Sequence, residues 1–417
     1  MVQGSGSRKA YVVGVGIGLV IASFFVFWLS NFSFTAGRAD FMYLADAFLH
    51  LRVWIPVGLA PNAPIVGEND VILVNGHIFV PFAPFPAVAL MPLIALIGPV
   101  NADHWETAIN AALAATVVGL AYWVSGRIGV RKISGRLFLA LLLGFSTQIW
   151  WVTTRGGVWH TGHLIATILV LLLIAELFGK QRALLMGFLV GLGFLTRAPL
   201  AFAGPGLALW VLAQSGAFRG GLSLGERARA LPWGGWIALM VGFAPSLAFF
   251  FFYNWARFGS IFESGYGLAA LPPFLETLRQ QGLFSPVHIG MNVELLFLKL
   301  PRFTAEFPWF QPDGLGMSVF FTSPALLLAL LAPWRDRRTW VLAITALLVL
   351  IPTLLYYGGG WLQYGYRYFL DSIPFVWAMV GLYSARKHRG GFPWWAWVLL
   401  GWGVIVGAAG VYWAYHL

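Results

Sequence analysis

The feature that most constrains this chain is a series of apolar runs that recur from one end to the other. A helix needs about 20 mainly apolar residues to cross roughly 30 Å of hydrocarbon. By that criterion we expect about 11 membrane-spanning helices. The runs lie at about 11–31, 105–125, 137–153, 161–178, 183–197, 200–214, 234–255, 317–333, 339–356, 368–384 and 393–413. The sequence therefore predicts an all-α polytopic membrane protein, with residues 1–417 forming a single transmembrane domain.

Composition supports an apolar surrounding. Of the 417 residues, 59% are hydrophobic and only 10% are charged, whereas a soluble domain carries about 25% charged residues. The chain has no cysteine, which excludes disulfides, thiolate metal sites and cysteine nucleophiles.

Compact basic clusters separate the apolar runs. They are Arg8 and Lys9; Arg127, Arg131, Lys132 and Arg136; Lys180 and Arg182; Arg219, Arg227 and Arg229; Arg335, Arg337 and Arg338; and Arg386, Lys387 and Arg389. Short cytoplasmic loops collect Lys and Arg, and the predicted spans place every cluster on one side. We therefore expect a cytoplasmic N-terminus. The net charge of +11 then reflects topology, and we expect no nucleic-acid partner.

Residues 82–99 are apolar enough to be taken for another span. If they crossed the membrane, the following basic clusters would change sides. The segment is short and contains Pro84, Pro86 and Pro92, which interrupt a helix. We expect it to lie on the membrane surface as a juxtamembrane element.

Two long segments, 32–104 and 256–316, are then left on the extracytoplasmic side. Long loops in a compact protein are usually functional or disordered. Both segments are rich in aromatic residues and proline, which favours ordered structure at the membrane interface over a flexible linker.

The first candidate site follows the first span. In GRADFMYLADAFLHLRVW, Asp40, Tyr43 and Asp46 occur at helical spacing. Neighbouring carboxylates at a membrane surface can act as a general base and its support. An ordinary solvated helix with acids in its first turn gives the same pattern, and both interpretations stay open.

A second candidate is TTRGGVWHTGH at 153–163. His160 and His163 are three residues apart and can share one helical face. Two imidazoles can share a divalent metal, but a third ligand cannot be placed from sequence. We favour hydrogen-bonded interfacial histidines and assign no metal ligand.

Several arginines lie on the outer side close to span ends, namely Arg155, Arg197, Arg302 and Arg367. A guanidinium group binds phosphate through two parallel hydrogen bonds, although a long basic side chain can also reach out to phospholipid headgroups. The segment YYGGGWLQYGYRYFLD at 356–371 gathers glycines and aromatics, including Tyr366, around Arg367. Glycine permits close backbone approach to a ligand.

The segment YNWARFGSIFESGYG at 253–267 places Arg257 and Glu263 just outside a span. It is equally compatible with a substrate loop and with a structured turn.

These motifs together resemble the GT-C superfamily of membrane glycosyltransferases, which includes protein O-mannosyltransferases and aminoarabinose transferases. Asp40, Tyr43 and the following LADAF are similar to the part of the first outer loop that carries their catalytic aspartate. The proline-rich residues 81–99 resemble their juxtamembrane helices. Further similar segments are NAALAATVVGLAYWVSGRIG at 110–129, GFLTRAP at 193–199, YNWARFGSIFESGYG and GYRYFLDSIPF.

The resemblance implies a GT-C-like bundle with an extracytoplasmic active site in the bacterial plasma membrane, serving the cell envelope. It implies a polyprenyl-phosphate-linked sugar donor, a glycan, lipid or protein acceptor, and an inverting displacement. Asp40 would be the general base, and Arg367 or Arg197 would stabilise the departing phosphate. Tyr43, Asp46, Arg155, His160, His163, Arg257, Glu263 and Tyr366 complete the expected substrate-binding set.

The chain departs from the mannosyltransferase pattern in two respects. Phe41 follows Asp40 where an acid is usual, and no KPP-type sequence precedes the juxtamembrane segment. The resemblance therefore does not specify the sugar or the acceptor, and it names no cofactor.

The alternative function is a lipid or sugar transporter or flippase without glycosyl transfer. Transporters place polar groups near the bilayer midplane on broken helices. The predicted spans carry few ionisable residues, and the acids gather in the outer loops, which favours chemistry at the membrane surface.

Overall fold

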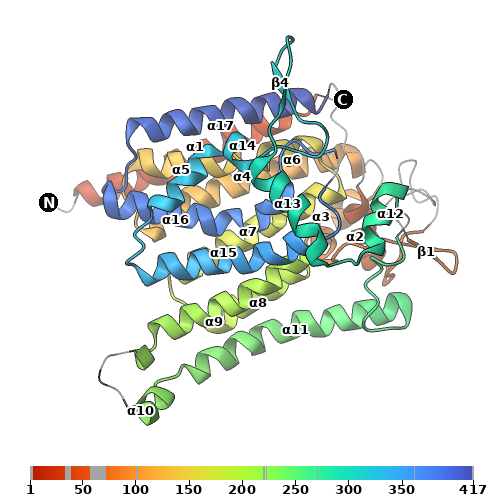
Figure 1. Cartoon of the computed structure of the whole chain (residues 1–417), viewed down its shortest axis with the longest axis horizontal. Coiled ribbons are helices and arrows are strands. Elements are labelled where there is room, and N and C mark those ends of the chain that lie inside the picture. The colour runs from red at the N-terminus through yellow and green to blue at the C-terminus, as the bar shows by residue number, and fades with distance from the viewer. Residues whose placement is uncertain are drawn as a thin grey trace.

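The computed structural model describes residues 3–32, 39–56, 72–99, 102–218, 221, 223–269, 271–360 and 362–415. Arg219 and parts of the first outer loop, at 33–38 and 57–71, lie outside the described residues. The described chain is largely helical, and most of its long helices run side by side (Figure 1).

Six helices are long and apolar enough to cross a membrane. They are α1 (Gln3–Leu29), α4 (Ala102–Ile128), α7 (Val158–Leu177), α11 (Trp233–Phe258), α15 (Arg337–Leu355) and α17 (Trp394–Trp413). A seventh span is formed if α5 (Ile133–Phe145) and α6 (Ile149–Arg155), which are bent by 44° at their junction, cross together. The described residues thus confirm a polytopic helical protein.

The predicted number of 11 spans is not confirmed. The remaining predicted spans are short or broken helices: α8 (Ala183–Phe194), η1 (Ala198–Phe202) with α9 (Ala203–Gln214), α14 (Val319–Thr322) with η5 (Pro324–Leu331), and η6 (Arg367–Asp371) with α16 (Ile373–Lys387). A 12-residue helix such as α8 is only about 18 Å long, so it does not cross the hydrocarbon layer unaided. Apolar composition predicted these segments, but it did not predict their breaks.

Smaller elements connect the long helices. The first outer loop contains α2 (Asp40–Leu49), β1 (Ile72–Val74), β2 (His77–Phe79) and α3 (Phe85–Ile97). The second contains α12 (Pro273–Gln280), η3 (Pro286–His288), α13 (Ile289–Val293), η4 (Glu294–Leu298), β3 (Arg302–Phe303) and β4 (Phe310–Gln311). Elements α2, α3, α12 and β1 gather at one end of the bundle, while η2 (Gly216–Phe218), α10 (Leu224–Arg229) and the N-terminus belong to the other end (Figure 1).

The proline-rich segment forms α3, a helix of 13 residues that packs against α2. Pro84 and Pro86 do not interrupt this helix, because they stand at its N-cap and in its first turn, where no backbone N–H donor is needed. Pro92 lies inside α3. The helix is shorter than the membrane-spanning helices and belongs to the outer end.

Glycines permit close helix contacts in the bundle. A Cβ atom placed on Gly187 of α8 would collide with the backbone carbonyl of Leu239 on α11, and one on Gly242 of α11 would collide with the carbonyl of Leu184. Small residues allow such backbone approach between membrane helices. Helix α11 is consequently held mainly by α8, and few of its residues are buried.

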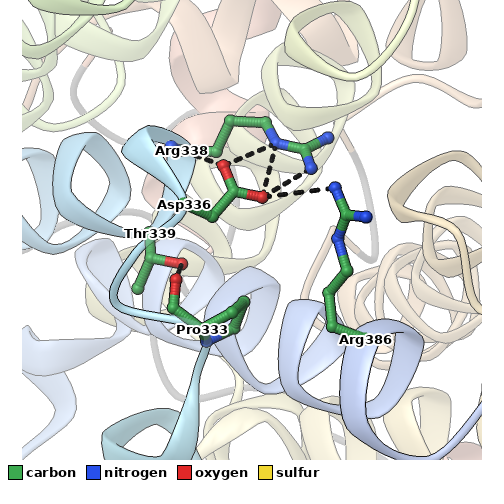
Figure 2. A network of polar contacts seen from close by, with 5 residues as sticks. All are labelled: Pro333, Asp336, Arg338, Thr339 and Arg386. Carbon is green, nitrogen blue, oxygen red and sulfur yellow. Dashed lines mark hydrogen bonds and ion pairs between the residues drawn. The ribbon is translucent and has the colours of Figure 1, made fainter.

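Described residues of several basic clusters make contacts at the end of the bundle opposite α2. Arg127 donates a hydrogen bond from Nη1 to the Ala175 carbonyl (3.2 Å), and the Arg338 guanidinium lies 5.7 Å from the centre of the Phe178 ring. Asp336 lies between Arg338 and Arg386 (Figure 2). These contacts join loops that are distant in sequence and define a basic end of the molecule. We refer to the opposite end, which carries α2, as the outer end.

Candidate functional site

Helix α2 begins with Asp40, and its side chains from Asp40 to Ala47 are buried. Asp40 is 1% exposed, and Tyr43 is completely buried. The apolar residues of α2 pack with α3, the first outer hairpin and Val158 at the start of α7. This burial is incompatible with an ordinary solvated helix, so Asp40 occupies an enclosed position.

Asp46 does not form a carboxylate pair with Asp40. The two residues are six positions apart, which corresponds to about 9 Å of helical rise. The Asp46 carboxylate instead lies 3.6 Å from Nδ1 of His50. Asp40 and Asp46 therefore belong to different surroundings on α2.

The two histidines occupy the first turns of α7, which follows a reversal at Gly156 and Gly157. His160 Nδ1 makes a 2.5 Å hydrogen bond with the Gly156 carbonyl oxygen. His163 is fully buried, and its Nδ1 lies 3.4 Å from Oδ1 of Asp371. The hydrogen bond of His160 agrees with the prediction of hydrogen-bonded histidines, and both rings are enclosed by protein.

Asp371 is the centre of a polar cluster at the start of α16. Arg197 donates from Nε to both carboxylate oxygens of Asp371, at 2.6 and 2.7 Å. The Asp371 side chain is 1% exposed and that of Arg197 is 18% exposed. A buried carboxylate requires such partners, because an isolated buried charge is strongly disfavoured.

Tyr368 brings a second arginine to this cluster. The guanidinium carbons of Arg197 and Arg367 lie 5.5 and 5.0 Å from the centre of its ring. The backbone N–H of Arg367 donates to Oε1 of Gln363 at 3.2 Å. The structure thus places two cationic side chains around one aromatic ring beside Asp371.

Tyr366 holds the same loop to α13. Its hydroxyl donates a 3.1 Å hydrogen bond to Oδ1 of Asn292, and Asn292 Nδ2 donates to the carbonyls of Leu354 and Tyr356. Burial raises the pKa of Tyr366 above its usual range, so the hydroxyl remains a hydrogen-bond donor. The described contacts of Tyr366 therefore support the position of the loop.

Helix α2 and the Asp371 cluster are connected through α7. A Cβ atom on Gly162 would lie 3.9 Å from the Phe41 ring, and Gly162 directly precedes His163. Phe41 also lies 6.4 Å from the ring centre of Phe82, which in turn lies 6.4 Å from that of Tyr266. Phe41, which follows Asp40 in the chain, therefore lies close to Gly162. The next residue of α7 is His163, whose ring is close to Asp371.

Arg257 and Glu263 form a structured turn. Arg257 donates to the Val80 carbonyl (3.0 Å) and the Ser264 carbonyl (3.1 Å), and also to Oδ1 of Asn254 (2.8 Å). Glu263 accepts a 2.6 Å hydrogen bond from the Gly265 N–H. Of the two interpretations of this segment, these contacts favour the turn.

Arg155 lies at the end of α6, where its Nη1 donates to the Ala414 carbonyl at 3.2 Å. Its described hydrogen bond is thus to the C-terminal segment, and it does not join the contacts around Asp371.

Sequence reasoning did not include Glu106 of α4, which is 2% exposed. Thr161 of α7 donates to Oε1 of Glu106 at 2.8 Å, and its hydroxyl also lies 3.0 Å from Oδ1 of Asn110. An ionisable residue inside an apolar span is itself a signal of function, and the position of Glu106 within the run 105–125 carried that signal. Its neighbour Thr161 stands between the two histidines of α7.

Among the described residues there is no group of three or more His, Cys, Asp or Glu side chains arranged to hold a metal ion.

No protein-family model matches this chain, and neither does any curated protein. Among solved structures, it is similar to the crystal structure of the Archaeoglobus fulgidus oligosaccharyltransferase tethered through a disulfide to an acceptor peptide that contains the NVT sequon. The identity is 14% and the TM-score is 0.34, with 95% of this chain and 54% of that chain covered. This chain therefore spans about half the length of that enzyme.

Proposed function

We propose that this chain is an inverting glycosyltransferase at the extracytoplasmic face of a bacterial plasma membrane. It transfers a sugar from a polyprenyl-phosphate donor to a glycan, lipid or protein acceptor. In this proposal residues 1–417 are one transmembrane domain in which the short and broken helices complete 11 crossings, and the basic end is cytoplasmic. Residues 32–104 and 256–316 then form the two outer loops beside the site.

One observation carries the proposal. A buried acid at the start of α2 is followed by Phe41, which contacts α7 beside His163, and His163 faces the cluster of Asp371 and Arg197. A general base and a cationic site are thus on adjoining elements at the end of the bundle opposite the basic clusters. Transfer from a lipid phosphate needs both groups within reach of one sugar.

The proposed base is Asp40. The acceptor hydroxyl oxygen attacks the anomeric carbon, the bond from that carbon to the phosphate oxygen breaks, and Asp40 takes the hydroxyl proton. The polyprenyl phosphate leaves with the bonding electron pair as an anion. A preorganised cation stabilises this developing charge more effectively in an enclosed site than in water.

We assign the phosphate contact to Arg367 and a supporting role to Arg197. The Nε donor of Arg197 is already used by both oxygens of Asp371, so this arginine holds α16 to the α8 side of the bundle. The Arg367 guanidinium carbon lies 5.0 Å from the centre of the Tyr368 ring, which Arg197 also approaches. Arginine suits the role because its planar group binds phosphate with two parallel hydrogen bonds.

The experiment separates binding from chemistry. Purified full-length protein is incubated with polyprenyl phosphate, and binding is measured by native mass spectrometry for the wild type, Asp40→Asn and Arg367→Gln. We expect Asp40→Asn to bind normally and Arg367→Gln to bind at least about tenfold more weakly. With a polyprenyl-phosphate sugar, Asp40→Asn should lose at least about 100-fold in turnover. Near-normal turnover of Asp40→Asn would refute the assignment.

A transporter or flippase remains the second candidate because of the break between α5 and α6. The bend of 44° lies at a polar junction, where Gln148 donates from Nε2 to Oγ1 of Thr322 at 3.0 Å. Broken helices with polar groups are a feature of transporters. Vesicles that contain a fluorescent polyprenyl phosphate distinguish the two functions, since a flippase moves this lipid between leaflets without an acceptor. If the Asp40→Asn protein moved it as fast as the wild type, transport would replace glycosyl transfer as the proposed function.

A further inference from the structure

A groove with a volume of about 350 Å³ runs between α1 and α4 on the exposed side of α1. Its α1 wall extends from Val12 to Ile21, and its α4 wall includes Trp123. Val13, Ile17 and Ile21 are each more than half exposed. The groove is therefore an apolar surface that faces outward from the helical bundle.

Two glycines set the depth of this groove. A Cβ atom on Gly16 would lie 3.2 Å from the Tyr122 ring, and one on Gly119 would lie 2.5 Å from Cγ2 of Val20. The helices approach closely at these two points because neither position carries a side chain. The shape of the groove between α1 and α4 therefore depends on these two glycines.

The length of the groove fits one leaflet of a membrane. Val12 and Ile21 are nine residues apart along α1, which corresponds to about 14 Å at 1.5 Å per residue. Half of a hydrocarbon core of about 30 Å is 15 Å. A single acyl chain lying along α1 would extend over this distance.

The groove ends at a cation. Arg136, at the start of α5, donates from Nε to the Val130 carbonyl at 2.9 Å, which fixes its guanidinium at the mouth of the groove. The Arg136 guanidinium carbon lies 5.9 Å from the centre of the Tyr122 ring. Beside it, the Arg127 guanidinium carbon stands 4.3 Å from the ring centre of Trp123. The groove's lining contains no acid among the described residues.

We propose that this groove is a binding site for an anionic phospholipid of the leaflet at the basic end. One acyl chain lies along α1 between Val12 and Ile21, and the lipid phosphate contacts the terminal amino groups of Arg136. The combination of an apolar channel one leaflet long with a fixed cation at its end selects this class of ligand. The inference does not depend on glycosyl transfer.

The first test compares two lipid headgroups. Full-length protein in detergent is titrated with phosphatidylglycerol or phosphatidylcholine, and bound lipid is counted by native mass spectrometry. The wild type should prefer phosphatidylglycerol, and Arg136→Gln should weaken its binding about tenfold, as expected for a charge-assisted hydrogen bond. Arg136→Lys should retain most of the binding. Arg131→Gln is the matched control, because Arg131 is exposed in the loop just before α5 and is not among the residues that line the groove.

Two outcomes would overturn the proposal in this test. One is equal binding of both lipids by the wild type, and the other is wild-type binding by Arg136→Gln. The variant Ile17→Trp tests the apolar part independently, because it fills the groove and leaves Arg136 in place. It should reduce phosphatidylglycerol binding, and unchanged binding would place the lipid elsewhere.

A second copy of the chain is the competing occupant. Since the chain contains no cysteine, Ile17→Cys introduces a single thiol in the groove. In phosphatidylglycerol vesicles we expect this variant to remain monomeric under mild oxidation. Efficient formation of a disulfide-linked dimer would show that another protein molecule covers the groove, and the lipid site would be rejected.

Discussion

Asp336 and Asp371 stand near opposite ends of α15 and α16, and each carboxylate is paired with an arginine. Asp336 at the basic end accepts from Arg338 at 2.6 Å and lies 3.5 Å from Arg386 (Figure 2). Its side chain is 18% exposed, whereas that of Asp371 is 1% exposed. Water and salt screen the first cluster, while the second depends on its protein partners. The same residue types therefore stabilise a loop at one end and form a candidate anion site at the other.

The largest expected effect is at the buried cluster. Asp371→Asn leaves Arg197 without its ionic partner, and removal of one member of a buried pair costs about 3–5 kcal/mol. We expect a large loss of folded protein on heating in detergent, measured by size-exclusion chromatography after heat treatment.

The double variant Asp371→Leu, Arg197→Met is the control for that prediction. Replacement of both partners by apolar residues removes the unpaired charge, so part of the lost stability should return. If Asp371→Asn were as stable as the wild type, the distinction between the two clusters would be wrong.

The second expected effect concerns ligand binding. Arg367→Gln should weaken polyprenyl-phosphate binding by about 10- to 100-fold, which corresponds to the loss of a charge-assisted interaction. Arg386→Gln removes the same charge at the basic end and should leave binding unchanged. Titration followed by native mass spectrometry measures the binding of polyprenyl phosphate by both variants. If both variants lost the same amount of affinity, binding would not depend on Arg367 and its neighbours at the outer end.

A smaller effect is expected at the basic end. Asp336→Asn weakens a partly exposed ion pair, for which typical contributions are about 0.2–1 kcal/mol. The thermal midpoint should fall slightly at low ionic strength, and the difference should shrink in high salt. A loss as large as that for Asp371→Asn would contradict the comparison.

The smallest effect is on pH dependence. Hydrogen bonds from Arg338 hold the pKa of Asp336 below its usual range, against the opposing effect of burial. Because the folded-state pKa is the lower one, the pair stabilises the fold above pH about 4, and this contribution is lost as pH falls through the folded-state pKa. The difference in thermal midpoint between the wild type and Asp336→Asn should be constant from about pH 5 to 8 and vanish in acid. A difference that grew on acidification would have the wrong sign.

The long membrane helices were predictable from sequence. The apolar runs at 11–31, 105–125 and 339–356 correspond to α1, α4 and α15, because hydrophobic length is a direct requirement of the bilayer. The 13-residue length of α3 agrees with the prediction of an element shorter than a span, and its place relative to the membrane stays a prediction. The breaks in α14–η5 and η6–α16 were not predictable, since they depend on tertiary contacts that replace backbone hydrogen bonds.

The candidate site was predictable only as separate pieces. Asp40, His163 and Arg197 were identified individually, but 174 residues separate Arg197 from Asp371, and no local pattern pairs them. Arg257 is a different case, because its motif was equally compatible with a substrate loop and a structured turn, and the hydrogen bonds described for it are to the protein itself. A charged residue near the end of a span looks the same in the local sequence whether it binds a ligand or supports the fold.

The contacts of Arg257 have a mechanical consequence. One guanidinium at the outer end of α11 binds the carbonyl of Val80, 177 residues away in the chain, and that of Ser264 just beyond α11. A displacement of α11 along its axis would therefore move parts of both outer loops in the same direction.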